Sequence, residues 1–322
     1  MAAVDVVDIH TESFVWTRVF GYDVSAAHGR GVLGARLYSQ ADLPRMKAGG
    51  LTGAVMSVAT NPFRRQGRRP ATLAANVDRL ARSLQAAGEG VEVVGDLAGY
   101  RRARSAGRFP CFVAVQGGNA AASAEGLPRA VSRVTLVHLT RSVLGSPSAP
   151  LGGDRGLTAA GRGFVEGCNE RRVLVDLAHA SPRTFWDSLA VHAADVPPIV
   201  SHTGVQGVHR SWRNVDDNQI RAVADRGGVV GIMYHRGFLG GSTSDAVLRH
   251  LEHVVAVGGE GAPALGSDWD GMIVTPRDMP TAADLPVLVA GMLRRGWPES
   301  RIRGVLGANY LRVVGDVRPG GG

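Results

Sequence analysis

Residues 4–12 read VDVVDIHTE, a largely apolar, β-branched run that ends in a histidine and a carboxylate. Valine and isoleucine favour strands, and a near-continuous apolar run is typical of a strand that is buried on both faces. His10 and Glu12 are two residues apart, so on a strand both side chains point to the same face. The stretch predicts a buried strand that carries two metal-binding side-chain types at its C-terminal end.

Further short apolar runs follow along the chain, at residues 53–60, 111–116, 133–139, 172–179, 198–203, 227–235 and 262–268. Amphipathic stretches of helical period lie between them, at residues 71–87, 158–170 and 244–259. Alternating strands and helices imply a parallel sheet whose faces are covered by the crossover helices. The eight runs therefore predict an α/β fold, a (β/α)8 TIM-like barrel.

A polar residue stands at the C-terminal end of nearly every run: His10 with Glu12, Gln116, His138, His179, His202, His235 and Asp268. In a TIM barrel the C-terminal ends of the strands form one mouth, where catalytic groups converge. Imidazole nitrogen and carboxylate oxygen are ligands for Zn²⁺ and similar ions. The pattern predicts a metal site at the barrel mouth. Asp176 and Asp270 are expected to have structural roles, and His235 matches no recognised ligand position.

Length and composition fit one domain. The chain has 322 residues and 44% hydrophobic content, enough for a single large core. We expect one barrel domain over residues 1–316, with residues 18–50 as a lid or capping excursion and residues 317–322 as a disordered tail. Cys111 and Cys168 lack the spacing of a disulfide framework or a cysteine metal site.

The formal net charge of +8 does not by itself indicate a nucleic-acid partner. Lys47 is the only lysine, and the arginines are spread along the chain rather than gathered in one basic segment. No apolar run approaches the length of a membrane span, and the first residues lack the pattern of a secretory signal. We expect a cytoplasmic protein that binds neither nucleic acid nor membranes.

Short motifs appear in a fixed order along the chain: DIHTE (8–12), QGG (116–118), TLVH (135–138), VDLAHAS (175–181), SHT (201–203), WRNVDD (212–217), GSDWDG (266–271) and GANYLRV (307–313). Together they resemble the motifs of the renal, or membrane, dipeptidase family, zinc peptidases among the amidohydrolase-like barrels. The resemblance runs from about residue 4 to residue 315. It implies a TIM-like barrel, a dipeptide-like or amide substrate, and a homodimer.

The resemblance also implies a site for two metal ions. His10 and Glu12 would hold one ion, and His179 and His202 the other. A metal-activated water would attack the substrate carbonyl, and the ions would stabilise the negative charge that develops on its oxygen.

Three further residues take roles from the same resemblance. Asp268 would accept and pass on a proton, or lie close to the metal. His138 would polarise or hydrogen-bond the reacting carbonyl, and Arg213 would receive the substrate carboxylate, a group that arginine binds in bidentate fashion.

Three positions depart from the family pattern. Gln116, a neutral amide, stands where the family has the glutamate that bridges both ions, and its own role is open between weak ligand, substrate hydrogen bond and vestige. Glu12 replaces an aspartate, and Asn119 stands where the family often has histidine. Two divalent ions about 4 Å apart repel by roughly 15–20 kcal/mol at an effective dielectric constant near 20, and an anionic bridge offsets this repulsion. We expect one tightly held ion, Zn²⁺ by default, rather than two.

Three functions remain open from the sequence. The first is a metal-dependent hydrolase that cleaves a dipeptide or small amide. The second is a repurposed enzyme of the same fold, with a tailoring reaction in specialised metabolism. The third is a catalytically inactive binding homologue. Retention of His179, His202 and Asp268 favours the first two, because decay would be expected to change these residues as well.

Overall fold

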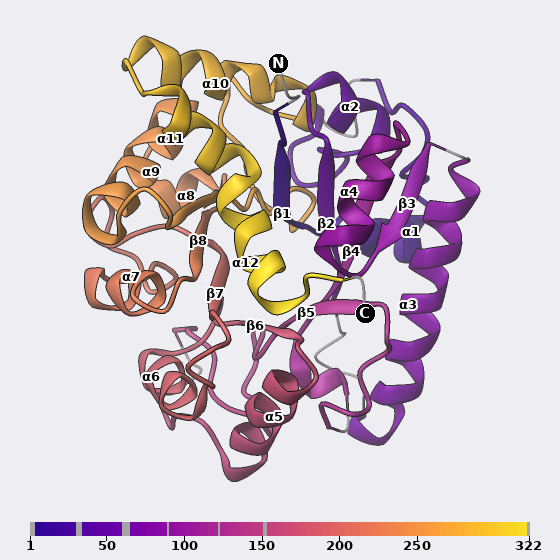
Figure 1. The fold of residues 1–322 in the computed structure, drawn as a ribbon, viewed down its shortest axis with the longest axis vertical. Helices are drawn as coiled ribbons and strands as arrows, with labels where there is room; N and C mark the ends of the chain where they lie inside the picture. Colours follow the sequence, from indigo (N-terminus) through magenta and orange to yellow (C-terminus); the bar gives the residue numbers. More distant parts are fainter. Residues whose placement is uncertain are drawn as a thin grey trace.

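The computed structural model describes residues 4–29, 34–59, 65–88, 90–121, 123–150 and 153–320. Eight parallel strands form the predicted barrel (Figure 1): β1 (Val7–Thr11), β2 (Gly53–Ala59), β4 (Phe109–Gln116), β5 (Val131–Thr135), β6 (Leu174–Asp176), β7 (Ile199–Thr203), β8 (Val229–Ile232) and β9 (Pro263–Leu265). They pair in the order in which they are named here. The α/β barrel expected from the sequence is confirmed.

Backbone hydrogen bonds join the first strand to the segment after the last one. The N–H of Asp268 donates to the carbonyl of His10 (3.0 Å), and the N–H of Glu12 donates to the carbonyl of Trp269 (2.8 Å). These bonds link β1 to residues 268–269, so the ring of strands closes at its C-terminal end, which is also where the predicted site lies.

Most strands are shorter than the apolar runs that predicted them, although β4 is longer, and one strand was not predicted. The run at 172–179 contains only Leu174–Asp176 as strand, and the run at 227–235 only Val229–Ile232. The residues that follow leave the ladder and build the mouth. The unpredicted strand, β3 (Val91–Val94), pairs with the first half of β4, outside the ring.

Helices surround the ring of strands (Figure 1): α1 (Ser13–Phe20), α2 (Leu43–Ala48), α3 (Arg69–Ala86), α4 (Leu97–Ser105), α5 (Ala159–Glu170), α6 (Pro182–Val191), α7 (Asp217–Ala224), α8 (Arg236–Leu239), α9 (Ser244–Gly258), α10 (Leu285–Arg294), α11 (Glu299–Arg303) and α12 (Asn309–Val317). Helices α3, α5 and α9 confirm the three amphipathic stretches within two residues.

Local sequence explains where several helices begin. Thr158 caps α5 by accepting from the N–H of Gly161, and Asp216 forms a capping box with Gln219 at the start of α7. Each cap satisfies a backbone N–H that the first helical turn leaves without a partner. Capping side chains thus fix the first residues of α5 and α7.

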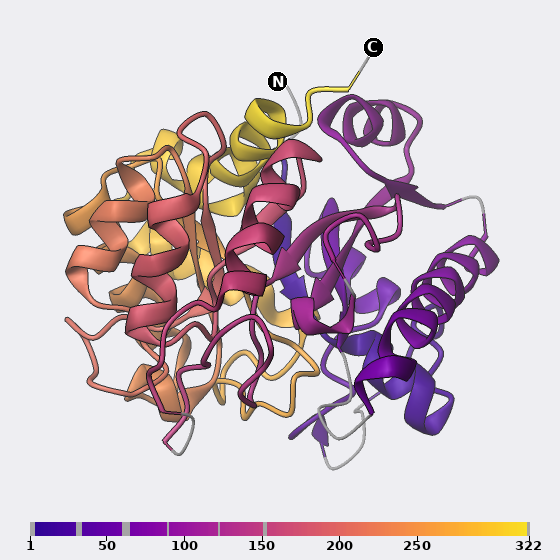
Figure 2. The ribbon, with the colours of Figure 1, turned by 90° about the horizontal axis from the view of Figure 1, so that it is seen from below.

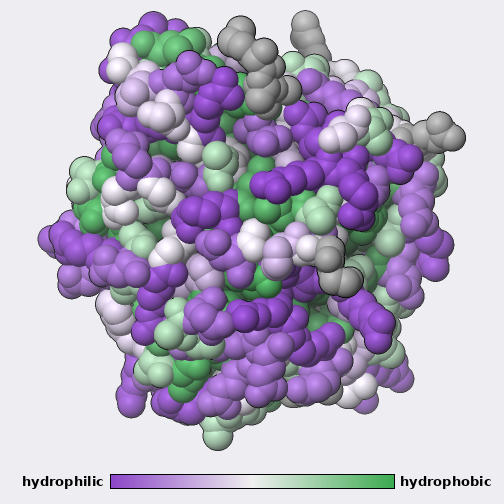
Figure 3. Space-filling model, in the orientation of Figure 1, coloured by the Kyte–Doolittle hydropathy of each residue, from purple (hydrophilic) through white to green (hydrophobic). Residues whose placement is uncertain are grey.

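The end of the barrel opposite the mouth is closed by α12. Figures 1 and 2 show this helix lying across the strands, at the end of the molecule where both termini lie. Its buried residues Tyr310, Val313 and Val317 pack in one apolar cluster with Val7 of β1 and Phe112 of β4. The face seen in Figure 3 is largely hydrophilic, with small and separate hydrophobic patches. Because α12 covers this end of the barrel, we expect the site to open at the other end, where the strands have their C-terminal ends.

The expected lid and tail are only partly described. Within residues 18–50, Gln40 exchanges hydrogen bonds with Asp270: its N–H donates to Oδ1 (2.7 Å) and its Oε1 accepts from the Asp270 N–H (2.8 Å). This anchors the excursion at the mouth, and its role as a lid stays a prediction. At the C-terminus, the carbonyls of Arg318 and Pro319 accept from the N–H groups of Leu97 and Ala98. The last two residues of the expected tail, 317–322, lie outside the described residues, and its disorder stays a prediction.

Candidate metal centre

The barrel strands deliver three of the predicted site residues directly. His10 lies on β1, Gln116 is the last residue of β4, and His202 lies on β7. Two more lie just beyond strand ends in a left-handed backbone conformation, His179 with φ 64° and Asp268 with φ 62°. Non-glycine residues rarely adopt this conformation, and it often marks functional sites. Here it belongs to two side chains that turn into the mouth.

Four histidines form a compact group. His179 Nε2 and His202 Nε2 are 2.9 Å apart, and the rings of His10 and His202 stack with their centroids 3.7 Å apart. His138 meets the ring of His179 edge-on, with the centroids 4.7 Å apart. The nitrogen pair of His179 and His202, predicted to bind one ion together, is thus present in the fold.

Two carboxylates face the same histidine. His10 Nε2 lies 3.3 Å from Glu12 Oε1 and 3.5 Å from Asp268 Oδ1. One ligand atom from each of His10, His202 and Asp268 lies within 4.8 Å of the other two.

Two donor atoms of this group indicate that it can hold a metal ion. Glu12 Oε1 and His10 Nε2 are buried and have no hydrogen-bond partner among the residues that the structure describes. Buried polar atoms without a partner are costly, and a cation among them would remove that cost. Nitrogen and oxygen donors of this kind suit Zn²⁺. The residues therefore fit at least one divalent ion.

Burial shifts the pKa of each of these groups towards its neutral form. It raises the pKa of Asp268 to about 8, although the nearby Arg213 acts against the rise, and it raises the pKa of Glu12 well above its usual range. Burial likewise holds the pKa of His179 and His202 well below the usual range of histidine. Neutral imidazoles can coordinate a cation, and a bound cation would favour the ionised carboxylates.

The remaining predicted residues border this group. Gln116 Nε2 lies 2.9 Å from His138 Nε2, and burial lowers the pKa of His138 to about 3. Arg213 is buried, and its Nη2 donates to the carbonyl of His202 (2.7 Å). Burial lowers the pKa of Arg213 to about 10, so it stays a cation at neutral pH. The structure places all three beside the metal-ligand candidates, while the roles expected for them stay predictions.

Arg133 was missed by the sequence reasoning. Arg133 lies on β5 beside His10, and its side chain is fully buried. It donates to His10 Nδ1 (3.0 Å) and to Asp176 Oδ2 (3.2 Å). Arg133 stands two residues before Thr135 on β5, so the two side chains share one face of the strand.

His235, the other histidine at the end of a predicted strand run, does not join the group. Its Nδ1 accepts from the N–H of Gly237 (3.4 Å), and its ring meets Phe238 edge-on. It lies at the start of α8 and serves below as a control position.

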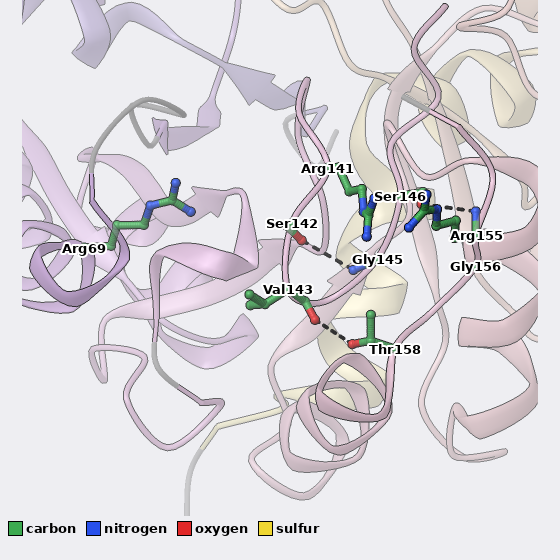
Figure 4. Close-up of a pocket in the computed structure, with 9 residues that line it drawn as sticks. All are labelled: Arg69, Arg141, Ser142, Val143, Gly145, Ser146, Arg155, Gly156 and Thr158. Atoms are coloured by element: carbon green, nitrogen blue, oxygen red, sulfur yellow. Dashed lines mark hydrogen bonds between the residues drawn. The ribbon is translucent and has the colours of Figure 1, made fainter. Parts of the chain in front are cut away.

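A polar pocket of about 450 Å³ lies at the same end of the barrel. Its lining comes from segments after β2 and β5 and includes Arg69, Arg141 and Arg155 (Figure 4). The figure shows the side chains of Arg141 and Arg155 extending into one space beside Ser146. Basic groups near the mouth would attract anionic substrates. None of the predicted metal ligands lines this pocket.

Comparison with known proteins agrees with this geometry. A family model described as membrane dipeptidase, peptidase family M19, matches residues 1–319. This chain belongs to the membrane dipeptidase family. The resemblance found in the motifs from residues 8–12 to residues 307–313 is therefore confirmed.

A curated relative from Klebsiella pneumoniae, an uncharacterised protein in the pqqA 5' region, is 34% identical over 169 residues. The match covers 50% of this chain and 61% of that relative, so the chain spans about three-fifths of the relative's own length.

Solved structures share the fold. The dipeptidase AC, a metallopeptidase of family M19, has a TM-score of 0.84 at 24% identity, and the match covers 99% of this chain and all of that one. A metallopeptidase from Rhodobacter sphaeroides, liganded with a phosphinate mimic of the dipeptide L-Ala-D-Ala, gives the same TM-score and identity over 98% and 99% of the two chains. The probable dipeptidase PvdM from Pseudomonas aeruginosa has a TM-score of 0.82 at 15% identity, over 98% and 96%.

No helix among the described residues is long and apolar enough to cross a lipid bilayer.

Proposed function

We propose that this protein is a metal-dependent hydrolase that cleaves a dipeptide or a small amide, with Zn²⁺ as the expected ion. The observation that carries the proposal is the group of His10, His202 and Asp268, with His179 Nε2 2.9 Å from His202 Nε2, at the mouth of a barrel of the membrane dipeptidase family. A divalent ion held there would activate water for attack and stabilise negative charge on the substrate oxygen.

The chain's own residues would bind and orient the substrate and move protons. Asp268, a carboxylate at the mouth of the barrel 3.5 Å from His10 Nε2, would take a proton from the attacking water and pass it to the leaving amine. His138, whose Nε2 lies 2.9 Å from Gln116 Nε2, would hydrogen-bond or polarise the reacting carbonyl. Arg213 supplies a buried cation for the substrate carboxylate.

The substrate class follows from these groups together. Basic residues in the pocket at the mouth and Arg213 both favour a substrate with a carboxylate. The relative from Rhodobacter sphaeroides was solved with a mimic of L-Ala-D-Ala, and we extend the dipeptide class from that protein to this one. The proposal covers one small-molecule substrate and requires no nucleic acid or membrane; a homodimer and a cytoplasmic location remain expectations from the sequence.

Elemental analysis and an activity panel test this proposal. The purified protein is expected to carry about one zinc ion per chain and to hydrolyse at least one member of a panel of dipeptides and small amides. Removal of the ion with a chelator should abolish turnover, and Zn²⁺ should restore it. A protein with no bound metal and no turnover would contradict the proposal and favour the inactive binding homologue.

The neutral Gln116 favours a second candidate, a repurposed enzyme with a tailoring reaction other than peptide hydrolysis. Gln116 contacts His138, so the amide stands beside the group expected to meet the substrate. One bound ion without activity on any dipeptide would support this candidate over the first.

A further inference from the structure

The basic pocket beside the metal-ligand candidates has no acidic group in its walls. Of the described residues that line it, Arg69, Arg141 and Arg155 are cationic and none is acidic. The side chains of Arg141 and Arg155 extend into one space (Figure 4), and neither guanidinium has a hydrogen bond or ion pair with a described residue. Cations gathered in a hollow without a counter-ion create a positive potential that attracts anions. The pocket, of about 450 Å³, is therefore suited to an anionic group.

One wall of the pocket is held in place by helix α6. The N–H of Ser146 donates to Thr184 Oγ1 (3.0 Å), and the N–H of Leu157 donates to Asp187 Oδ2 (3.0 Å). Gly156 packs so closely against the same helix that a Cβ atom at this position would overlap Asp187 Oδ2. The wall is therefore fixed by specific contacts with a helix, and Asp187 is directed at the backbone rather than at the arginines.

Ser146 adds a buried hydroxyl to the two guanidiniums. Its Oγ accepts from the backbone N–H of Arg155 (3.2 Å), and the residue is only 1% exposed. The hydroxyl proton itself has no acceptor among the described residues. A buried donor without an acceptor is costly, and an anion in the pocket would accept this proton. Figure 4 shows Ser146 beside the side chains of Arg141 and Arg155, so all three can contact one anionic group.

Two chain connections place the pocket next to the candidate metal centre. Arg141 follows His138 by three residues, and three residues of chain span at most about 11 Å. On the other side, the carbonyl of Ser146 accepts from the N–H of Ser181 (3.0 Å), two residues after His179. A dipeptide whose scissile carbonyl lies at His138 can therefore extend a side chain towards the pocket.

We propose that this pocket binds a second anionic group of the substrate, the side-chain carboxylate of an acidic residue. Arg213 does not line the pocket and donates to the carbonyl of His202, so it is available for the C-terminal carboxylate of the same substrate. The substrate class is then a dipeptide or amide that contains aspartate or glutamate, and Arg141 and Arg155 determine this specificity. The inference rests on the proposed function for hydrolysis, although binding in the pocket does not require turnover.

Initial rates on matched pairs of dipeptides test the inference. Ala-Glu with Ala-Gln, and Glu-Ala with Gln-Ala, differ in charge but hardly in size, and both pairs are measured in the L,L and L,D series. For at least one pair, wild type is expected to show a kcat/KM about 5- to 25-fold higher for the acidic member, because each exposed arginine contributes up to about fivefold to an ion pair.

Variants of the pocket arginines assign that preference to the pocket. Arg141→Gln and Arg155→Gln should each reduce it about two- to fivefold, and the double variant should bring it close to one. Arg162→Gln is the matched control, because it removes an exposed charge of α5 that does not line the pocket, and it should keep the wild-type preference. Circular dichroism establishes that each variant is folded.

The outcomes separate this inference from the proposed function. Hydrolysis without any preference for the acidic member, or with a preference that the double variant and Arg162→Gln change equally, would overturn the inference and leave the proposed hydrolase intact. If no dipeptide is hydrolysed, the proposed function fails, and calorimetric titration of the same four dipeptides into the full-length protein still tests the pocket. Tighter binding of an acidic dipeptide that the double variant loses would support the pocket, and equal binding of both members of each pair would overturn it.

Discussion

The Nε2 atoms of His179 and His202 lie 2.9 Å apart in the mouth of the barrel. Two bare nitrogen lone pairs would repel at this distance, so either one nitrogen donates a proton to the other or a cation lies against both. The strand β7 fixes one ring, and the left-handed turn after β6 brings the other ring to it. The pair is therefore a property of the backbone and not of a flexible side chain.

Replacement of either histidine of this pair should remove the ion. His202 belongs both to the pair with His179 and to the group with His10 and Asp268, so His202→Ala weakens a set that needs at least three protein ligands for catalytic zinc. We expect loss of bound zinc and a fall in kcat/KM of at least about 10²-fold, the scale on which loss of an electrostatic catalytic group acts. Elemental analysis and initial rates measure both. His235→Ala, a histidine at the mouth but outside the group, should keep its zinc and its activity, and an equal loss in both variants would contradict this prediction.

A carboxylate at position 116 should create a second ion site. Gln116→Glu adds a negative charge beside His138, where the neutral amide now lies, and an anion offsets the repulsion between two divalent ions. The zinc content is expected to rise from about one towards two ions per chain at saturating Zn²⁺. Gln116→Met, neutral and of similar length, is the matched control and should stay at one ion. A zinc content of one in Gln116→Glu would show that charge at this position does not limit metal binding.

The barrel was predictable because its signal is repeated. Nearly all of the eight runs combine apolar residues, most of them β-branched, with a polar residue at the end, so errors in single strands do not change the class of fold. The strand β3 escaped because the sequence VEVV is four residues long and includes the half-buried Glu92, and so lacks an extended apolar run. Strand ends were placed too late because His179 leaves the ladder in a left-handed turn that no periodic pattern indicates.

The missed part of the site has a different cause. In a chain with many arginines, Arg133 reads as one more surface cation, and nothing local marks it as buried. Its burial is offset by Asp176, 43 residues away, which accepts from the guanidinium and from Thr135. Such a pair is created by the adjacent positions of β5 and β6 in the barrel, so the fold had to be known before it could be found.

Arg213 should distinguish substrates by their C-terminal carboxylate. Its cation is buried beside His202, and a charged hydrogen bond to a carboxylate contributes about 1.5–3 kcal/mol, equal to roughly 10- to 150-fold in kcat/KM. Wild type is therefore expected to prefer a dipeptide over its C-terminal amide by a factor in this range. Arg213→Lys should lose most of that preference through KM, because lysine lacks the planar pair of donors. A variant that slows both substrates equally would show that Arg213 only supports the carbonyl of His202.

His192 should make the protein sensitive to acid, independently of the metal. Its ring is 7% exposed, and neither nitrogen has a hydrogen-bond partner among the described residues; burial, and then Arg226, lowers its pKa to about 4. The unfolded chain takes up this proton at the ordinary pKa near 6.5, so the free energy of unfolding falls as the pH drops from 6.5 to 4 and is constant below that for this group. A shift of this size corresponds to at most about 3 kcal/mol. In denaturant titrations at a series of pH values, His192→Phe should lower the number of protons taken up on unfolding between pH 6.5 and 4 by about one. Comparison at pH 8, where His192 is neutral in both states, isolates the packing change, and an unaltered slope between pH 6.5 and 4 would show that the folded protein protonates His192 normally.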